Sequence, residues 1–375
     1  MSRKQITNIE VKKNNRNRIF RYMCRNGVLS NPDIAYATKM SLPTVTQMTR
    51  ELMEQGLVQE LGELQSTGGR RAKALAVAAN ARLAVGLDIT RNHVSFVLTN
   101  LLGENLKYER IVCPYSHEAA YYQGVCQKLE DFLQEAGADR DAVLGMGISY
   151  PGIIDLDREM ISSSHVLNIK GISFFEISRY FPYPCYFLND ANAGAYGEGI
   201  SSREESSFFY LSLSNTVGGA FFHNKELEQG KNFRCGEVGH MTILPEGETC
   251  YCGKKGCLDV YCSARVLSER TGGRLEPFFE RLSQGEEEFV NFWDTYTNYL
   301  AVAVNNIHMV LDCDIVLGGY VGSQIAPYVE KFREKVFDRN TFGENPSFVR
   351  VCKDQVGAAA LGAALSVVEG FLEEV

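Results

Sequence analysis

The sequence predicts an α/β protein made of a small N-terminal domain and a larger body with two lobes. Two observations support this division. Residues 1–80 hold three short helical patterns followed by two short strands, whereas strands and helices alternate from Leu83 onward. At 375 residues the chain also exceeds the usual size of a single hydrophobic core. We therefore predict one domain over residues 1–80 and a second, two-lobed domain over 81–375.

Three helices are predicted in the N-terminal domain, which we call the head. The first covers residues 14–26 and ends at Gly27. The second opens at an Asn31 N-cap, where proline follows directly, and ends in a turn at residues 39–40. The third opens at a Ser41 cap and ends at Gly56. The short turn between the last two helices is typical of a helix-turn-helix.

The third helix has one apolar and one polar face. Val45, Met48 and Leu52 fall on one stripe and are expected to pack inward. Thr46, Gln47 and Arg50 then point outward, with the size and polarity needed to contact base edges in a major groove. The alternative is a three-helix scaffold that contacts another protein.

A hairpin completes the head. Strands over residues 57–61 and 73–77 enclose the turn Ser66-Thr67-Gly68-Gly69-Arg70-Arg71, which suits a wing that contacts phosphates. Residues 1–80 carry 13 Lys and Arg against 6 Asp and Glu, a balance of +7, and the remainder carries 25 against 40, a balance of −15. A basic head on an acidic body favours a polyanionic partner for the head. The predicted DNA contacts are Thr44, Thr46, Gln47, Arg50, Arg70 and Arg71.

The body shows two similar halves. Strands over residues 85–89 and 94–98 form a hairpin, and a third strand, a helix and a further strand follow over 106–112, 119–136 and 143–149. Strands over 209–213 and 219–223 repeat the hairpin. This pattern suggests a duplicated fold with a cleft between lobes, as in the actin and hexokinase (ribonuclease H-like) group. Any pair of α/β domains would give a similar pattern.

A cysteine-rich cluster predicts a metal site. His240, Cys250, Cys252 and Cys257 lie within eighteen residues and form a complete tetrahedral ligand set for Zn²⁺. With no position left open for water, a structural zinc is expected rather than a catalytic one. The alternative is a buried cluster of free cysteines.

Four motifs then occur in order: residues 147–155 (Gly-Ile-Ser-Tyr-Pro-Gly-Ile-Ile-Asp), 188–193 (Leu-Asn-Asp-Ala-Asn-Ala), 236–240 (Gly-Glu-Val-Gly-His) and the cysteine cluster. Together they closely resemble the ROK family, which contains sugar-responsive repressors and sugar kinases. The resemblance covers essentially the whole chain, including the winged helix that the family's repressors carry and its kinases lack.

The resemblance implies a sugar site in the body. Sugar hydroxyls need paired donors and acceptors, which Asn189, Asp190 and Glu237 would supply on short loops. His240 would offer one ring nitrogen to zinc and the other to the sugar. Asp259 stands where the family usually has Glu, and Asn168 matches a sugar-contacting Asn in a stretch that here lacks the family's Trp. Each of these polar residues could instead be a loop cap or turn former.

A sugar kinase is the main alternative function. Asp190 matches the family's general base, but the kinases' Asp-x-Gly-Gly-Thr phosphate loop reads Asp88-Ile89-Thr90-Arg91-Asn92 here. Side chains at Thr90 and Arg91 would block the close approach of ATP that glycines allow. A second loop over residues 214–219 keeps only part of its glycines. We therefore expect no enzymatic activity. A third possibility is a body that serves only for dimerisation.

The expected protein is a cytoplasmic repressor whose binding to double-stranded, palindromic operator DNA depends on a sugar effector. Reduced thiols beside a zinc cluster and the lack of a long apolar segment favour the cytoplasm and no membrane association. A homodimer, or a dimer of dimers, would present two recognition helices to the operator.

Overall fold

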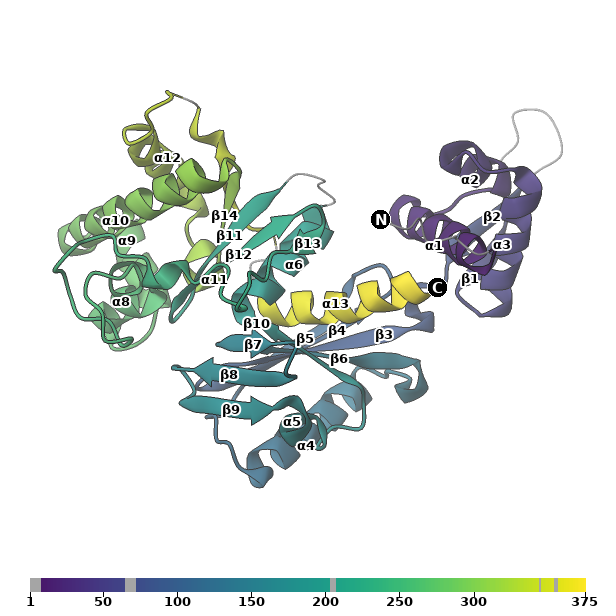
Figure 1. The fold of residues 1–375 in the computed structure, drawn as a ribbon, viewed down its shortest axis with the longest axis horizontal. Coiled ribbons are helices and arrows are strands. Elements are labelled where there is room, and N and C mark those ends of the chain that lie inside the picture. Colours follow the sequence, from purple (N-terminus) through teal and green to yellow (C-terminus); the bar gives the residue numbers. More distant parts are fainter. Residues whose placement is uncertain (1–7, 65–71, 203–206, 344, 354–356) are drawn as a thin grey trace.

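The computed structural model describes residues 8–64, 72–202, 207–343, 345–353 and 357–375. The described residues form the head and two lobes, and each lobe is built on a five-stranded sheet (Figure 1). The mixed α/β class is therefore confirmed. Within the described chain, no helix has both the length and the apolar character needed to cross a lipid bilayer.

The head has the predicted three helices and hairpin. Its elements are α1 (Asn8–Asn26), α2 (Asn31–Thr38), α3 (Leu42–Glu54), β1 (Val58–Glu63) and β2 (Lys73–Val77). α1 begins earlier than the predicted Asn14. The predicted Asn31 cap is wrong, because Ser30 is the N-cap of α2: its hydroxyl accepts the Asp33 N–H, and the Asp33 carboxylate accepts the Ser30 N–H at 3.0 Å. This reciprocal capping box satisfies two backbone donors at once.

The first lobe places antiparallel and parallel strands in one sheet. Its sheet order is β10-β6-β3-β4-β5, with β3, β4 and β5 antiparallel and β6 and β10 parallel to β3. A small sheet β7-β8-β9 extends it. The elements are β3 (Leu83–Ile89), β4 (His93–Asn100), β5 (Asn105–Val112), α4 (Ala119–Glu135), β6 (Val143–Tyr150), β7 (Ile153–Asp155), β8 (Met160–Ser164), β9 (Ile169–Ser173), α5 (Phe174–Ser178) and β10 (Cys185–Asn189).

The second lobe repeats this topology. Its sheet order is β13-β12-β11-β14-β15, again with an antiparallel β11-β12-β13 meander and parallel β14 and β15. The predicted duplication is confirmed at the level of strand order. The elements are β11 (Phe208–Leu213), β12 (Val217–His223), β13 (Glu226–Leu227), α7 (Asp259–Cys262), α8 (Ala264–Ser268), α9 (Glu276–Ser283), α10 (Glu287–Leu311), β14 (Asp314–Gly318), α11 (Gly319–Gly322), α12 (Val329–Phe337) and β15 (Val349–Val351).

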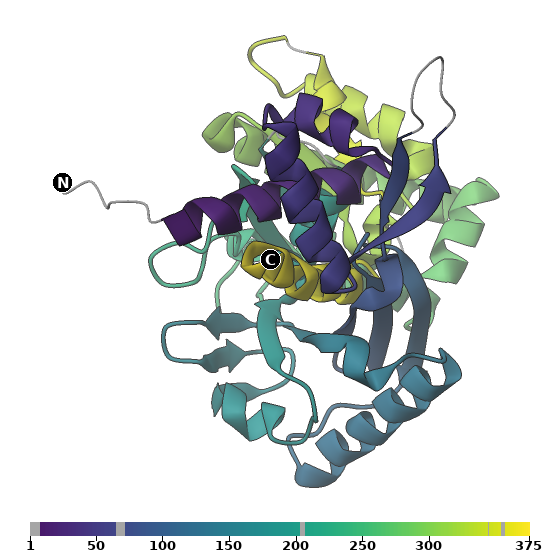
Figure 2. The same cartoon turned by 90° about the vertical axis from the view of Figure 1, so that its right-hand side faces the viewer.

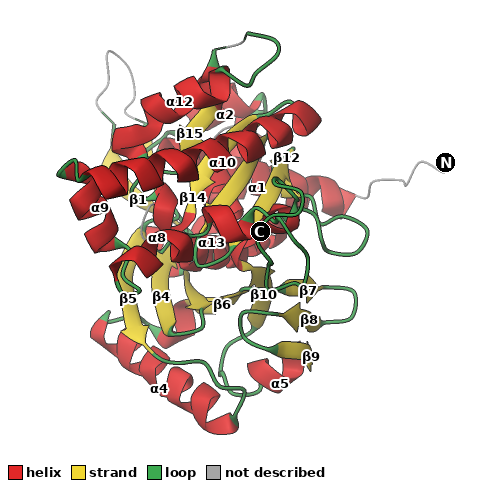
Figure 3. Ribbon diagram, turned by 90° about the vertical axis from the view of Figure 1, so that its left-hand side faces the viewer, coloured by secondary structure: helices red, strands yellow, loops and turns green. Residues whose placement is uncertain are grey.

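Two helices lie between the sheets. α6 (Asp190–Ser202) packs on β11 and β12, α13 (Ala358–Glu374) packs on β3 and β6, and the two helices contact each other. The helices approach the sheet and each other closely because glycines lie at these contacts. A Cβ added to Gly86 would lie 1.7 Å from the Ala360 carbonyl oxygen, and one added to Gly362 would lie 1.7 Å from that of Ala193. The outer faces of the sheets are covered by α4 in the first lobe and by α10 and α12 in the second (Figure 3).

The head packs on the far end of α13. Ile19, Phe20 and Met23 of α1 share one buried cluster with Val368 and Leu372 of α13. Polar contacts flank this core: the Arg21 guanidinium donates to the Glu369 carboxylate, and the Asn17 amide donates to the Leu372 carbonyl. Figure 2 shows α1 crossing α13 beside the C-terminus. One helix therefore connects the space between the lobes with the head.

Candidate functional site

The predicted metal ligands lie together. One ligand atom from each of His240, Cys250, Cys252 and Cys257 falls within 4.8 Å of every other. The Cys252 and Cys257 sulfurs are 3.7 Å apart, and His240 Nδ1 is 3.8 Å from the Cys250 sulfur. These separations match the edge of about 3.7 Å expected for a tetrahedron with zinc–sulfur bonds of about 2.3 Å. The cluster can hold a metal ion of that size.

Backbone geometry aims these ligands at one point. The Cys250 N–H donates to the Lys254 carbonyl at 2.7 Å, which closes a tight turn. Gly256 has φ +76° and no room for a Cβ, which would lie 1.8 Å from the Leu244 carbonyl oxygen. Burial raises the pKa of the Cys250 thiol to about 12. A thiolate at this position therefore requires a compensating cation.

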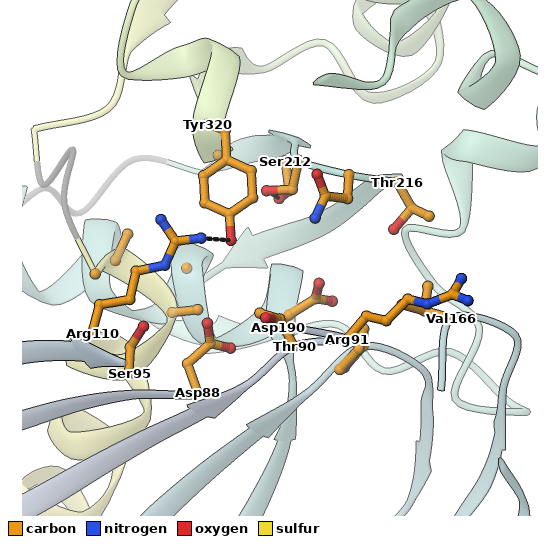
Figure 4. Close-up of a pocket in the computed structure, with 18 of the residues that line it drawn as sticks. Asp88, Thr90, Arg91, Ser95, Arg110, Val166, Asp190, Ser212, Thr216 and Tyr320 are labelled. Atoms are coloured by element: carbon orange, nitrogen blue, oxygen red, sulfur yellow. Dashed lines mark hydrogen bonds between the residues drawn. The ribbon is translucent and has the colours of Figure 1, made fainter. Parts of the chain in front are cut away.

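A cleft between the lobes contains two acidic side chains. Asp88 at the end of β3 and Asp190 at the start of α6 both line it (Figure 4). Burial, the neighbouring Asp88 and the more distant Glu237 raise the pKa of Asp190 to about 7, although backbone N–H groups oppose this shift. Burial raises the pKa of Asp88 to about 6, against the Ser149 hydroxyl, which donates to it at 2.7 Å. Two adjacent carboxyl groups that hold protons near neutrality can both donate and accept hydrogen bonds to a polyhydroxylated ligand.

Apart from Asp190, none of the predicted sugar ligands is among the residues that line this cleft. The Asn189 amide donates to the Gly152 carbonyl at 2.8 Å, and its oxygen accepts two N–H groups of α6, so this side chain mainly caps the helix. Asp259 is fully buried, and its carboxylate accepts the Val217 N–H at 2.6 Å. Asn168 is exposed in the β8–β9 turn with φ +55°, and Glu237 is exposed beside the metal cluster. Their sugar contacts stay predictions.

Two aromatic residues beside the cluster were not predicted. The Tyr251 hydroxyl lies 3.4 Å from His240 Nε2, the ring nitrogen that faces away from Cys250. The His165 ring, on the turn between β8 and β9, lies 5.6 Å from the Tyr251 ring. Burial raises the pKa of the Glu237 carboxyl group, and the nearby His165 and Arg234 partly offset this shift. Tyr251 lies between Cys250 and Cys252 in the sequence, so its position beside the cluster could have been predicted. Nothing in the sequence connects His165 to the cluster.

A contact between the lobes was also missed. Arg110 of β5 reaches across the cleft, where its guanidinium lies 3.4 Å from the Tyr320 hydroxyl of α11 and 5.3 Å from the ring centroid (Figure 4). A separation of 210 residues leaves no local sequence signal for such a pair.

In each of the two loops compared with kinase phosphate loops, one backbone donor is already bonded within the protein. The Thr90 N–H and hydroxyl both donate to the His93 carbonyl, each at 3.0 Å, which closes the β3–β4 turn. In the β11–β12 turn, the Val217 N–H is held by Asp259. Gly319 has φ +75° at the start of α11, where a Cβ would lie 2.7 Å from the Ser214 hydroxyl oxygen. The close contact with Ser214 and the positive φ together explain why a glycine is needed at this position.

The polar face of α3 is exposed as predicted. Thr46, Gln47 and Arg50 are exposed, Thr44 is half-buried, and Val45 and Leu52 are fully buried. Gln47 donates to Glu51 at 3.1 Å, and Arg50 lies 3.7 Å from Glu54, so both side chains lie along the helix surface. The other two predicted DNA contacts, Arg70 and Arg71, lie outside the described residues.

Comparison with known proteins assigns the body. A family model for the ROK family matches residues 84–369. The chain belongs to the ROK family. A second model, for winged helix-turn-helix DNA-binding domains, matches residues 13–59.

Relatives of this chain include transcriptional repressors. The chain is 26% identical to the xylose repressor of Bacillus spizizenii over 375 residues, covering 97% of both chains. It is 25% identical to the N-acetylglucosamine repressor of Escherichia coli O157:H7 over 281 residues, covering 74% of this chain and 69% of the relative.

Solved structures support the same fold. A ROK family transcriptional regulator, a homologue of the E. coli MLC protein, superposes with a TM-score of 0.77 at 20% identity and covers 97% of both chains. A ROK glucokinase from Streptomyces griseus, in complex with glucose and AMPPNP, superposes with a TM-score of 0.66 at 20% identity and covers 76% of this chain and 98% of its own. The predicted actin- and hexokinase-like architecture of the body is therefore confirmed.

Proposed function

We propose that this ROK protein is a transcriptional repressor whose affinity for operator DNA is set by a sugar bound between the lobes. One observation carries the proposal: α13 contacts the cleft at its first turn and the head at its last. A helix that packs on both sites can pass a change in lobe closure to the head. The repressors among the full-length relatives support the same function.

We propose that the metal is a structural Zn²⁺ held by His240, Cys250, Cys252 and Cys257. The closed set of three sulfurs and one nitrogen favours zinc and leaves no coordination position for a reacting water. His240 would bind it through Nδ1 and keep Nε2 for Tyr251 or a sugar hydroxyl, which would orient the ring. The 3-10 turn Val238–His240 carries Glu237 at its start, so the metal would also hold this acidic side chain in place.

Several side chains would contact the sugar. Asp190 on the cleft floor would accept from or donate to a hydroxyl, while Glu237 and His240 would contact it from the second lobe. Asn168 and Asn189 would approach from the first lobe. Asp259 would act indirectly, because its carboxylate is turned to the Val217 N–H.

A sugar kinase is the competing function, and the Thr90 and Arg91 side chains, which stand where the kinases have glycines, argue against it. Nucleotide phosphates need several free backbone N–H groups at close range. The Thr90 and Val217 N–H groups are already hydrogen-bonded within the protein. Asp190 would therefore bind the sugar without activating it. We also propose that the body dimerises, which would place two α3 helices on the half-sites of a palindromic operator.

The decisive experiment measures operator affinity with and without sugars. An operator is first selected from random DNA by the purified full-length chain, and its binding is followed by fluorescence anisotropy. A panel of pentoses, hexoses, amino sugars and their phosphates is then added. We expect one of them to weaken operator binding at least tenfold, and Asp190→Ala to remove this response while retaining operator binding.

Two outcomes would contradict the proposal. ATP-dependent sugar phosphate formed by the purified protein, and lost in Asp190→Ala, would favour the kinase. Operator binding that no sugar in the panel alters would favour a body used only for dimerisation.

A further inference from the structure

The turn between β3 and β4 places a cation on the wall of the cleft. We propose that the effector carries a negatively charged group, a phosphate ester or a carboxylate on a sugar, which Arg91 binds opposite Asn215 and Thr216. This inference rests on the proposed function, because it names the chemical class of the effector for the same cleft.

The Arg91 guanidinium is available for a ligand. Its side chain is exposed and lines the cleft, and the guanidinium forms no ion pair or hydrogen bond with any residue that the structure describes. Figure 4 shows it extended toward Val166 and Thr216 and directed away from Asp190. A guanidinium offers five donors in a planar fork that matches a carboxylate or phosphate.

The backbone around Arg91 is held in place. The Arg91 and Asn92 carbonyls accept the N–H groups of Tyr115 and Cys113, each at 2.9 Å. The turn is also closed by the Thr90 hydroxyl, as described above. The side chain therefore extends from a fixed base, which lowers the ordering cost of ligand binding.

The opposite lobe supplies neutral donors. Asn215 and Thr216 line the same cleft from the β11–β12 turn. This turn is fixed at both ends, because the Ser214 carbonyl accepts the Ala264 N–H at 2.7 Å and the Val217 N–H is bound by Asp259. An anionic group held by Arg91 and by these two side chains would bridge the lobes and favour a closed arrangement.

The acidic residues on the floor leave this cation free. Burial raises the pKa of Asp88 to about 6, and the Ser149 hydroxyl and Arg110 partly offset this shift. The Arg110 guanidinium is itself directed to Tyr320. Burial raises the pKa of Asp190 to about 7, and the Arg91 side chain is directed away from this carboxyl group (Figure 4).

The test compares neutral sugars with their charged derivatives by calorimetry on the full-length protein. The ligands are glucose, glucose 6-phosphate and glucuronate, N-acetylglucosamine with its 6-phosphate, xylose, and inorganic phosphate alone. The variants are Arg91→Gln, the conservative Arg91→Lys, and Arg158→Gln as a matched control, because Arg158 is an exposed arginine on the β7–β8 turn. Thermal unfolding of each variant checks that it folds.

We expect a charged sugar to bind at least about tenfold more tightly than its neutral parent, with an affinity that falls as salt rises. Arg91→Gln should remove this preference and leave the affinity of the neutral sugar within about twofold. Arg91→Lys should restore part of it, and Arg158→Gln should change nothing. A phosphate ester preferred over glucuronate, or the reverse, identifies the group.

The inference is overturned if neutral sugars bind as tightly as their charged forms, or if Arg91→Gln and Arg158→Gln behave alike. Either result leaves the sugar-responsive repressor intact. Inorganic phosphate that binds through Arg91 while every sugar fails would instead retain the anion site and remove sugar sensing. If no ligand binds through Arg91, the anion site is wrong.

Discussion

His240 links two kinds of chemistry in one side chain. Its Nδ1 faces the Cys250 sulfur, whereas its Nε2 faces the Tyr251 hydroxyl at 3.4 Å. A metal that fixes this ring would therefore also position Tyr251 beside it. Loss of the metal should therefore disturb the proposed sugar contacts of His240 and Glu237.

We expect Cys252→Ala to lower the zinc content from about one ion per chain to a small fraction of that value and to abolish the sugar response. The reason is that three remaining ligands cannot close the tetrahedron. Elemental analysis measures the metal, and Cys126→Ala on α4 is the matched control because its thiol lies outside the cluster. Full zinc content in Cys252→Ala would refute the ligand assignment.

Asp190 should make stability depend on pH. Its pKa of about 7 in the folded protein exceeds the ordinary value of 3.8, so the folded state holds the proton more tightly than the unfolded state. Stability from this group is present at low pH and is lost as pH rises from about 4 to about 7.

Asp190→Asn removes the titration, so its stability relative to the wild type should increase by at least about 1 kcal/mol between about pH 5 and about pH 8. Thermal unfolding of both proteins across this range measures the difference. A constant difference at every pH would show that Asp190 carries no raised pKa.

At the scale of single elements, we expect α3 and the hairpin turn of the head to have different roles in DNA binding. The exposed face of α3 presents side chains that can contact base edges, and the arginines at residues 70 and 71 would contact phosphates. Base contacts and phosphate contacts respond differently to DNA sequence and to salt.

We expect Arg71→Ala to weaken binding to all DNA sequences and to lower the slope of log affinity against log salt by about one. Gln47→Ala should reduce affinity for the selected operator and leave the slope unchanged. Anisotropy titrations at several salt concentrations distinguish the two. An unchanged slope in Arg71→Ala would exclude the wing from the DNA interface.

For the whole molecule, α13 joins the head to the body through a shared buried cluster. The buried cluster that holds α1 includes the end of α13, so the head core is completed by the body. Any movement of the lobes around α13 then changes the support of the helix-turn-helix. Linkage requires that sugar and operator change each other's affinity by the same factor.

Glu369→Gln tests this coupling, because it breaks the ion pair with Arg21 at the junction and touches neither binding site. We expect the factor by which the sugar changes operator affinity to fall about threefold or more, with each single affinity altered less. Glu374→Gln is the control on the same helix. Equal coupling in both variants would show that the junction does not carry the signal.

Local signals in the sequence located many elements of this protein and one group of candidate metal ligands. Apolar periodicity located α3 and its exposed face, and strand patterns located both hairpins, because these features depend on neighbours within a few residues. The metal cluster was predicted for the same reason, since its four ligands lie within eighteen residues. Even the error at Asn31 was local, as the competing Ser30 cap stands one residue away.

Only the tertiary structure decided how distant residues meet. The contact of Arg110 with Tyr320, the neighbouring carboxyl groups of Asp88 and Asp190, and the packing of α1 on α13 all join segments far apart in sequence. Their physical basis is the closure of two sheets around α6 and α13, where glycines permit backbone contact. Periodicity reports which face of an element is buried, but the partner of that face is chosen by the packing of the whole chain.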